Sequence, residues 1–517
     1  MNSVDNRFFV ALLILTTLFV GSAVSFGASD SGTIKIGTLD KGTGFDPADV
    51  FEMLSWEIND NIYDGLVTLN PKTGEVEPQL AKSWTISDDR KKITFELREG
   101  VKFHDGSRFT AEAVKFSLIR AANLGGSPGF LVADFVDTEN IELVNQYKIE
   151  IPLKVPYADA LNIFSIPIYS PVNPKKYSMD EFKPKNPSGT GPYKLTSWVK
   201  GSKIVLEKFE DYWGEEPKND KIIWKLYSKG SNLKFALQNK EVDMAWRSLS
   251  LEDVEQLLER GNYETSEGVG QIRFLVFNTQ SKPFDNVNLR KGIAAAINRS
   301  SLVNKVYYGL VPELYSLLPA NLSSSVPSFK NVYGEGSLDM AKDYLKEAGY
   351  TEDSPLEMEL WYTPSHYGAL EDELALVLKS QLERTGAIEV TLKSQEWATY
   401  IGRVAEGEMQ YPFLLGWGSA VFIPDWYTTN FLSKGGAKSM GSLYENEEMY
   451  DMVKEQRQTL DSEKRAEILA DIQQLTAEDA PYAPLVQRIS RVVQWDYIDG
   501  VDLGPGFTFR LSDIMKK

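Results

Sequence analysis

Apolar and polar residues alternate in short stretches along most of the chain, which is typical of a mixed α/β protein. Apolar residues at every second position predict strands at Thr33–Thr38 and Ile93–Leu97. Thr110 is a suitable N-cap for a helix through Arg120. The same reasoning predicts further strands at Tyr147–Ile151, Lys203–Glu210, Lys221–Tyr227, Ile272–Asn278, Ile388–Leu392 and Arg491–Trp495, and helices at Leu289–Ile297, Leu338–Ala348 and Leu370–Leu382.

Two turn-forming segments interrupt this pattern. Asp105–Gly106 predicts a hairpin turn, and the Gly- and Pro-rich passage Asn186–Pro192 predicts a bend between domains. A chain of 517 residues exceeds what one hydrophobic core usually supports. We therefore expect two or three domains.

The N-terminus carries the pattern of an export signal. Arg7 is the basic residue ahead of an apolar run, Phe8–Val20, and small residues follow from Gly21 to Ala28. The run is too short to span a bilayer, which takes about 20 residues. The sequence predicts a signal peptide at residues 1–28 and a protein that works in the periplasm or at the extracellular face of the cytoplasmic membrane. The alternative is that the segment is kept as a membrane anchor.

Composition excludes several classes of function. The formal net charge of −18 disfavours binding to nucleic acid. The chain has no Cys, so disulfides, Cys nucleophiles and thiolate metal sites are excluded. His104 and His366, the two His residues, cannot by themselves supply the ligand shell of a nickel ion, although carboxylates or a chelated metal could compensate. A surface or packing role is expected for His104. No metal and no cofactor is predicted.

The chain shows no recognisable catalytic motif. A secreted hydrolase that uses a carboxylate pair is an alternative, because the chain has 73 acidic residues. No nucleophile elbow or HExxH helix supports it, however. We therefore expect a protein that is not an enzyme and has no catalytic residues.

A series of motifs in consistent order resembles the dipeptide/oligopeptide/nickel group of extracytoplasmic solute-binding proteins, family 5, of ABC importers. The longest, Leu97–Leu118, looks like the family signature. The others are Asp46–Ala48, Ile62–Val67, Gly189–Trp198, Asn239–Trp246, Leu289–Arg299, Leu338–Tyr350, Ser394–Gln410 and Gly416–Tyr427. The resemblance covers nearly all of the chain after the leader.

The resemblance implies a periplasmic-binding-protein-like α/β fold of the large three-domain type, with two lobes and hinge strands between them. The first lobe would be discontinuous, and the chain would cross between lobes near Asn278 and Trp495. The implied division is 29–72, 188–278 and 495–517 for the first lobe, 73–187 for a domain inserted in it, and 279–494 for the second lobe. A monomer that binds a ligand in the interlobe cleft and delivers it to ABC permease subunits is expected.

The segment Gly416–Tyr427 bears on the ligand. The resemblance implies that an Asp shortly after the Gly-Trp pair holds a peptide's ammonium group, and ungapped alignment places Ala420 there. Ala cannot make a charge-assisted hydrogen bond, although Asp425 is an alternative from a neighbouring position. The resemblance also implies an Arg for the ligand carboxylate near residues 357–364, and none is present.

Aromatic residues remain at the expected cleft. The candidate ligand-binding residues are Phe45, Trp56, Trp361, Trp417, Ala420, Asp425, Trp426 and Tyr427, with core packing as the alternative for each Trp. Planar rings suit apolar side chains and sugar faces alike. The sequence therefore predicts a peptide-binding component of an importer, with an oligosaccharide-binding component as the alternative.

Overall fold

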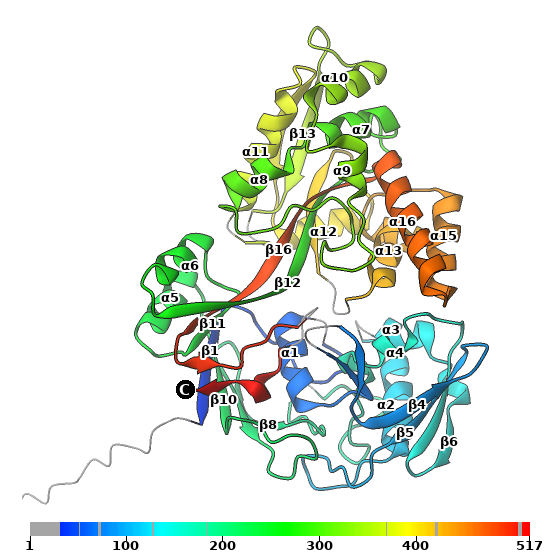
Figure 1. The fold of residues 1–517 in the computed structure, drawn as a ribbon, viewed down its shortest axis with the longest axis vertical. Helices are drawn as coiled ribbons and strands as arrows, with labels where there is room; N and C mark the ends of the chain where they lie inside the picture. Colours follow the sequence, from blue (N-terminus) through cyan, green and yellow to red (C-terminus); the bar gives the residue numbers. More distant parts are fainter. Residues whose placement is uncertain are drawn as a thin grey trace, which may run out of the picture.

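The protein has two lobes joined by a pair of long strands (Figure 1). The computed structural model describes residues 32–517 except 51, 71–73, 127–128, 184, 365, 369, 419–421 and 505–508. The predicted leader lies outside the described residues. Within the described part, no helix combines the length and apolar character needed to cross a membrane.

One ten-stranded sheet runs through both lobes in the order β14-β13-β15-β12-β16-β11-β1-β10-β9-β8. We call the part around β1 and β8–β11 the first lobe, and the part around β13–β15 the second lobe. The strands are β1 (Thr33–Thr38), β8 (Tyr193–Val199), β9 (Lys203–Lys208), β10 (Lys221–Leu226), β11 (Met244–Trp246), β12 (Tyr263–Val276), β13 (Leu356–Tyr362), β14 (Ile388–Ser394), β15 (Phe413–Trp417) and β16 (Tyr482–Trp495). The predicted strand at Thr33–Thr38 is confirmed with the same bounds.

A second, four-stranded antiparallel sheet with the order β4-β5-β7-β6 belongs to the first lobe. Ile93, Phe95 and Leu97 alternate with more exposed residues along β5 and pack into one core with helix α2. The elements of this lobe outside the large sheet are α1 (Met53–Ile62), β2 (Val67–Leu69), β3 (Val76–Pro78), β4 (Ala81–Ile86), β5 (Lys92–Leu97), α2 (Ala111–Leu124), α3 (Gly129–Phe135), β6 (Glu142–Asn145), β7 (Lys148–Pro152), α4 (Ala160–Ile163), α5 (Gly230–Gln238), α6 (Leu251–Leu258), β17 (Ile498–Asp499) and β18 (Met515–Lys516), with 3-10 turns at Thr138–Asn140, Pro167–Tyr169 and Leu511–Asp513.

Helices cover both faces of the sheet in the second lobe. Leu275 packs into one hydrophobic core, while its neighbours Phe274 and Val276 pack into another, because successive side chains of a strand point to opposite faces. The helices are α7 (Val287–Ala296), α8 (Arg299–Val306), α9 (Ser328–Tyr333), α10 (Leu338–Glu347), α11 (Glu371–Glu383), α12 (Trp397–Ala405), α13 (Pro424–Leu432), α14 (Lys434–Ser439), α15 (Glu447–Gln458) and α16 (Ser462–Asp479).

Strands β12 and β16 connect the lobes. They pair antiparallel from Tyr263↔Trp495 to Val276↔Tyr482, with a register shift between Val269 and Ile272. The sequence predicted only one end of each. Strand β11 pairs with β16 at residues 492–494, and β15 pairs with β12 at residues 272–276. We therefore propose that the chain crosses within these strands, ahead of Asn278 and Trp495; the rest of the predicted division stays a prediction.

Two predicted turns hold the first lobe together. Gly106 adopts a φ of +83° in the turn after Asp105. Gly189 packs so closely on the end of α1 that a Cβ there would lie 2.2 Å from the carbonyl oxygen of Ile62. His104 lies half-buried between these segments, and its Nε2 lies 3.0 Å from the carbonyl oxygen of Gly191. The structure thus places His104 in a packing role.

A buried ion pair fixes the loop that follows β1. Arg120 of α2 binds both carboxylate oxygens of Asp46 at 2.9 and 2.6 Å, and both side chains are almost fully buried. The same carboxylate accepts hydrogen bonds from the backbone N–H groups of Ala48 and Lys183. The loop that leads to α1 is therefore attached to the small-sheet part of the first lobe.

We predict that Arg120→Met lowers the free energy of unfolding by about 3–5 kcal/mol, because it leaves a buried carboxylate without its cation. The exposed pair between Lys102 and Asp211 provides the control, and Lys102→Met should change stability by less than about 1 kcal/mol. Guanidinium chloride denaturation followed by circular dichroism measures both. Equal effects of the two substitutions would contradict a supporting role for the buried pair.

Candidate functional site between the lobes

A short loop of the first lobe reaches three helices of the second. It comprises residues 157–159, between β7 and α4, and it contacts α13, α15 and α16. The backbone N–H of Ala158 donates to the carbonyl oxygen of Arg457 at 2.8 Å. The two lobes therefore touch directly in this structure.

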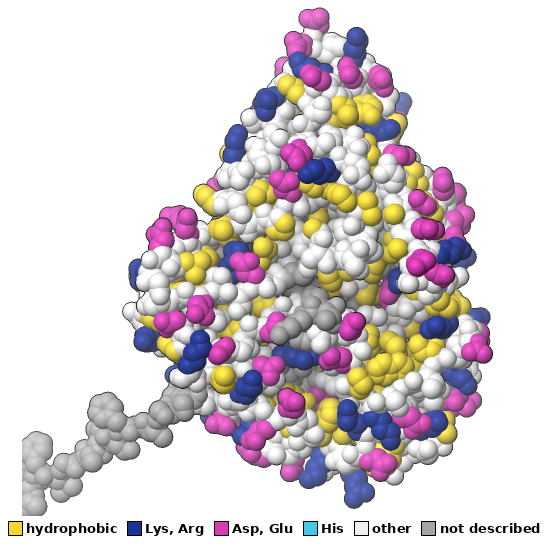
Figure 2. Space-filling view, viewed as in Figure 1, with side chains coloured by type: hydrophobic (Ala, Val, Ile, Leu, Met, Phe, Trp, Pro, Cys, Tyr) yellow, Lys and Arg dark blue, Asp and Glu magenta, His cyan; other side chains and the backbone are white. Residues whose placement is uncertain are grey.

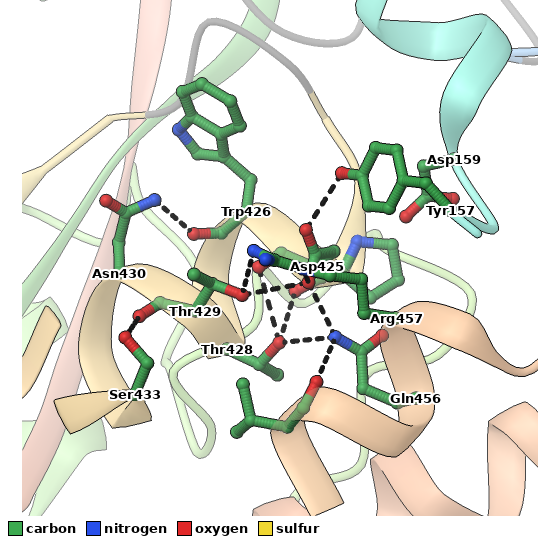
Figure 3. A network of polar contacts seen from close by, with 12 residues as sticks. Tyr157, Asp159, Asp425, Trp426, Thr428, Thr429, Asn430, Ser433, Gln456 and Arg457 are labelled. Carbon is green, nitrogen blue, oxygen red and sulfur yellow. Dashed lines mark hydrogen bonds and ion pairs between the residues drawn. The ribbon is translucent and has the colours of Figure 1, made fainter. Parts of the chain in front are cut away.

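Asp425, at the start of α13, is at the centre of these contacts (Figure 3). Its Oδ2 accepts a hydrogen bond from the Tyr157 hydroxyl of the first lobe at 2.8 Å. Its Oδ1 accepts from Thr429 at 2.8 Å, from Gln456 at 2.7 Å and from Arg457 at 3.1 Å. The side chain is almost fully buried. With four donors around it, the carboxylate offers no place for a ligand ammonium group in this conformation.

An ion pair beside Asp425 also joins the lobes. Arg465 of α16 holds both carboxylate oxygens of Asp159, with its Nη1 at 2.8 Å from Oδ1. Both side chains are mostly buried. Burial raises the pKa of Asp159, and the Arg465 guanidinium opposes that rise. We call Tyr157, Asp159, Asp425, Arg457 and Arg465 the interlobe cluster.

Aromatic side chains extend the contact. Trp426 and Ile423 of the second lobe belong to one hydrophobic core with Trp56 of the first lobe, and Trp417 packs against the same core. The Trp56 indole donates to the carbonyl oxygen of Val50 at 2.7 Å. Three of the predicted residues are thus brought together at the junction of the lobes.

The outer rim of the junction carries both apolar and polar side chains. A groove there is lined by Trp84 and Ile86 of β4 and by Leu460 of the turn between α15 and α16, with Ser87, Asp88 and Arg90 beside them. In the space-filling view, hydrophobic side chains gather on the first lobe just below the ends of α15 and α16 (Figure 2). The lobes therefore meet through apolar as well as polar surfaces.

The other predicted residues lie elsewhere. Phe45 is fully buried in the core of the first lobe, against Trp198. Trp361 donates to Glu359 and lies under Arg403, and Tyr427 is buried in the second lobe with its ring edge-on to Trp417. Ala420 lies outside the described residues. Phe45 therefore packs within the first lobe, and its role in ligand binding stays a prediction.

Sequence reasoning missed most of the interlobe cluster. Tyr157 and Asp159 are separated from their partners by 268 and 306 residues, and no motif marks either end. The one available signal was an acidic residue two positions after an aromatic one, Asp159 after Tyr157, a pattern too common to identify a site.

Comparisons with known proteins identify the family. Residues 75–439 match the model of bacterial extracellular solute-binding proteins, family 5 middle. The chain is 28% identical to the glutathione-binding protein GsiB of Shigella dysenteriae, over 98% of both chains. It is 27% identical to the DppA periplasmic binding protein of Helicobacter pylori, solved with the peptide STSA, with a TM-score of 0.78 over 94% of this chain and 99% of that one.

A further structure supports the fold alone. The substrate-binding protein CtaP of Listeria monocytogenes is 21% identical, with a TM-score of 0.84 over 94% of this chain and 99% of that one. The relatives are binding proteins that work with ABC permeases, not enzymes. The oligosaccharide alternative finds no support among them. This chain belongs to family 5 of the bacterial extracellular solute-binding proteins, and it is the substrate-binding component of an ABC importer of the peptide, nickel and glutathione type.

Proposed function

We propose that this protein captures a short peptide between its lobes and presents it to the importer. The observation that carries the proposal is the aromatic junction of Trp56, Trp417 and Trp426, in a chain that is similar from end to end to a glutathione-binding and a peptide-binding protein. Indole rings cover the apolar parts of a peptide and lose few rotamers in doing so.

The interlobe cluster links the proposed function to closure of the two lobes. Its charged groups would be hydrated in an open molecule and are paired with each other in the closed one. A ligand shifts the balance between open and closed forms only by its differential affinity for them. The cluster contributes lobe-to-lobe contacts that do not depend on the ligand, and these contacts fix how the two lobes meet.

Ligand class is tested by binding. We expect reduced glutathione or the peptide Ser-Thr-Ser-Ala to raise the melting temperature of residues 29–517, because a ligand at 100 times its dissociation constant adds about 2.7 kcal/mol to the native state. In a titration at constant temperature, the same peptide should also change the indole fluorescence, and Trp417→Phe should reduce that change.

Maltotriose at the same concentration is the control for the ligand screen, and we expect it to leave the melting temperature unchanged. Stabilisation by maltotriose, with none by a panel of di- to tetrapeptides, would contradict the proposed function.

Closure is tested at the Asp159–Arg465 pair. We predict that Arg465→Met opens the protein, because closing it would bury Asp159 without its cation at a cost of about 3–5 kcal/mol. The radius of gyration from small-angle X-ray scattering should rise. Peptide affinity from calorimetry should fall by roughly tenfold or more, since each 1.4 kcal/mol is a factor of ten.

The neighbouring Lys464 gives a matched control. It forms an exposed ion pair with Glu455 on the same pair of helices, and Lys464→Met should leave both measurements unchanged. A double variant, Asp159→Leu with Arg465→Met, should recover part of the closure because no charge is then buried alone. An Arg465→Met protein that closes and binds like the wild type would rule out this role of the cluster.

A further inference from the structure

Two arginines from the two connecting strands converge on one loop of the second lobe. Arg273 of β12 lies with its guanidinium carbon 4.0 Å above the ring of Tyr367. Arg488 of β16 donates to the backbone carbonyl oxygen of Tyr367. Residues 366–368 follow β13, so three separate strands bring this group together.

Positive charge exceeds negative charge in this group. Glu371, at the start of α11, pairs with Arg273, and both side chains are buried. No carboxylate of the described residues forms an ion pair with Arg488. Two guanidinium groups therefore share one carboxylate, which is a costly arrangement in a partly dehydrated site.

Arg273 also has unused hydrogen-bond donors. Its Nε and Nη1 are buried and have no hydrogen-bond partner among the described residues. The ring of Tyr367 lies against the guanidinium, and Tyr307 and Tyr367 both interact with it electrostatically. Arg120, by contrast, uses its Nε and both terminal nitrogens on Asp46 and on carbonyl oxygens. A buried donor without an acceptor costs about 1–3 kcal/mol, so such a group needs an explanation.

The position of the two arginines relates them to the ligand site. Arg273 pairs with Gly416 across β12 and β15, one residue before Trp417 of the aromatic junction. A Cβ at Gly416 would lie 2.5 Å from Nη1, so glycine leaves the space that the guanidinium occupies. Arg273 is fully buried, whereas Arg488 in front of it is partly exposed. Burial and the charge of Arg273 lower the pKa of Arg488. A bound anion would oppose this effect, because it stabilises the charged guanidinium.

We propose that Arg488, backed by Arg273, forms a carboxylate-binding subsite for the peptide ligand. A guanidinium binds a carboxylate through two parallel hydrogen bonds, which gives both affinity and orientation. The sequence has no arginine at residues 357–364, and here two arginines from distant strands reach the loop that follows that segment. This inference rests on the proposed function and adds that the ligand must carry a free carboxylate.

Calorimetry with Ser-Thr-Ser-Ala and its C-terminal amide, and with glutathione and its glycine ethyl ester, tests the subsite. The wild type should bind each free acid roughly 10- to 100-fold more tightly than the partner whose C-terminal carboxylate is blocked, as expected for a charge-assisted hydrogen-bonded pair. Arg488→Met should reduce that preference to within about threefold, and Arg488→Lys should keep part of it. Arg491→Met is the matched control on the same strand, because Arg491 is already paired with Glu267.

Two results would overturn the subsite. One is equal binding of acid and amide by the wild type. The other is an acid preference that survives in Arg488→Met. Either would leave the proposed function standing if peptides still bind. If no peptide binds, a thermal-shift comparison of succinate with succinamide tests whether the two arginines bind a carboxylate. Stabilisation by succinate in the wild type but not in Arg488→Met supports the subsite, and no difference rejects it.

Discussion

The antiparallel pairing of β12 with β16 is the constraint on which the two-lobed architecture depends. Each strand enters the sheet of both lobes, so the backbone hydrogen bonds between them set where one lobe lies relative to the other. Pairing is irregular between Val269 and Ile272, and Gly270 packs so closely on Arg488 that a Cβ would lie 2.3 Å from its carbonyl oxygen. A register irregularity bends the strand locally. We therefore expect this point to be the hinge between the lobes.

The same strands show why the sequence predicted some elements and not others. Thr33–Thr38 and residues 93–97 lie on cores, so their alternation follows the pleat, and their predicted positions are confirmed. The middle of β12 carries Glu267, Gly268 and Gly270, and the middle of β16 carries Arg488 and Ser490. This part passes between lobes rather than over a core, so no apolar face develops there. Only the ends of these strands could be predicted.

The site was predictable to a similar extent. Trp56, Trp417 and Trp426 meet at the junction because large apolar rings at the surface of each lobe gain most by mutual burial. The sequence could not show whether the Asp425 carboxylate is available to a ligand. Asp425 has four donors around it, and two of the residues that supply them, Gln456 and Arg457, come from a helix with no distinctive pattern. Hydrogen-bond saturation is a property of the three-dimensional arrangement and leaves no trace in local sequence.

The interlobe cluster and the arginine pair differ in how far the protein itself satisfies their charges. The Asp159–Arg465 pair is complete within the protein, and the cost of dehydrating two charges roughly cancels their attraction, so it makes closure specific without making it irreversible. The Arg273–Arg488 pair is incomplete, with more positive than negative charge and two donors without acceptors. In the proposed subsite, a bound carboxylate would complete it. The interlobe cluster therefore fixes how the lobes meet, whereas the arginine pair leaves part of its hydrogen bonding to the ligand.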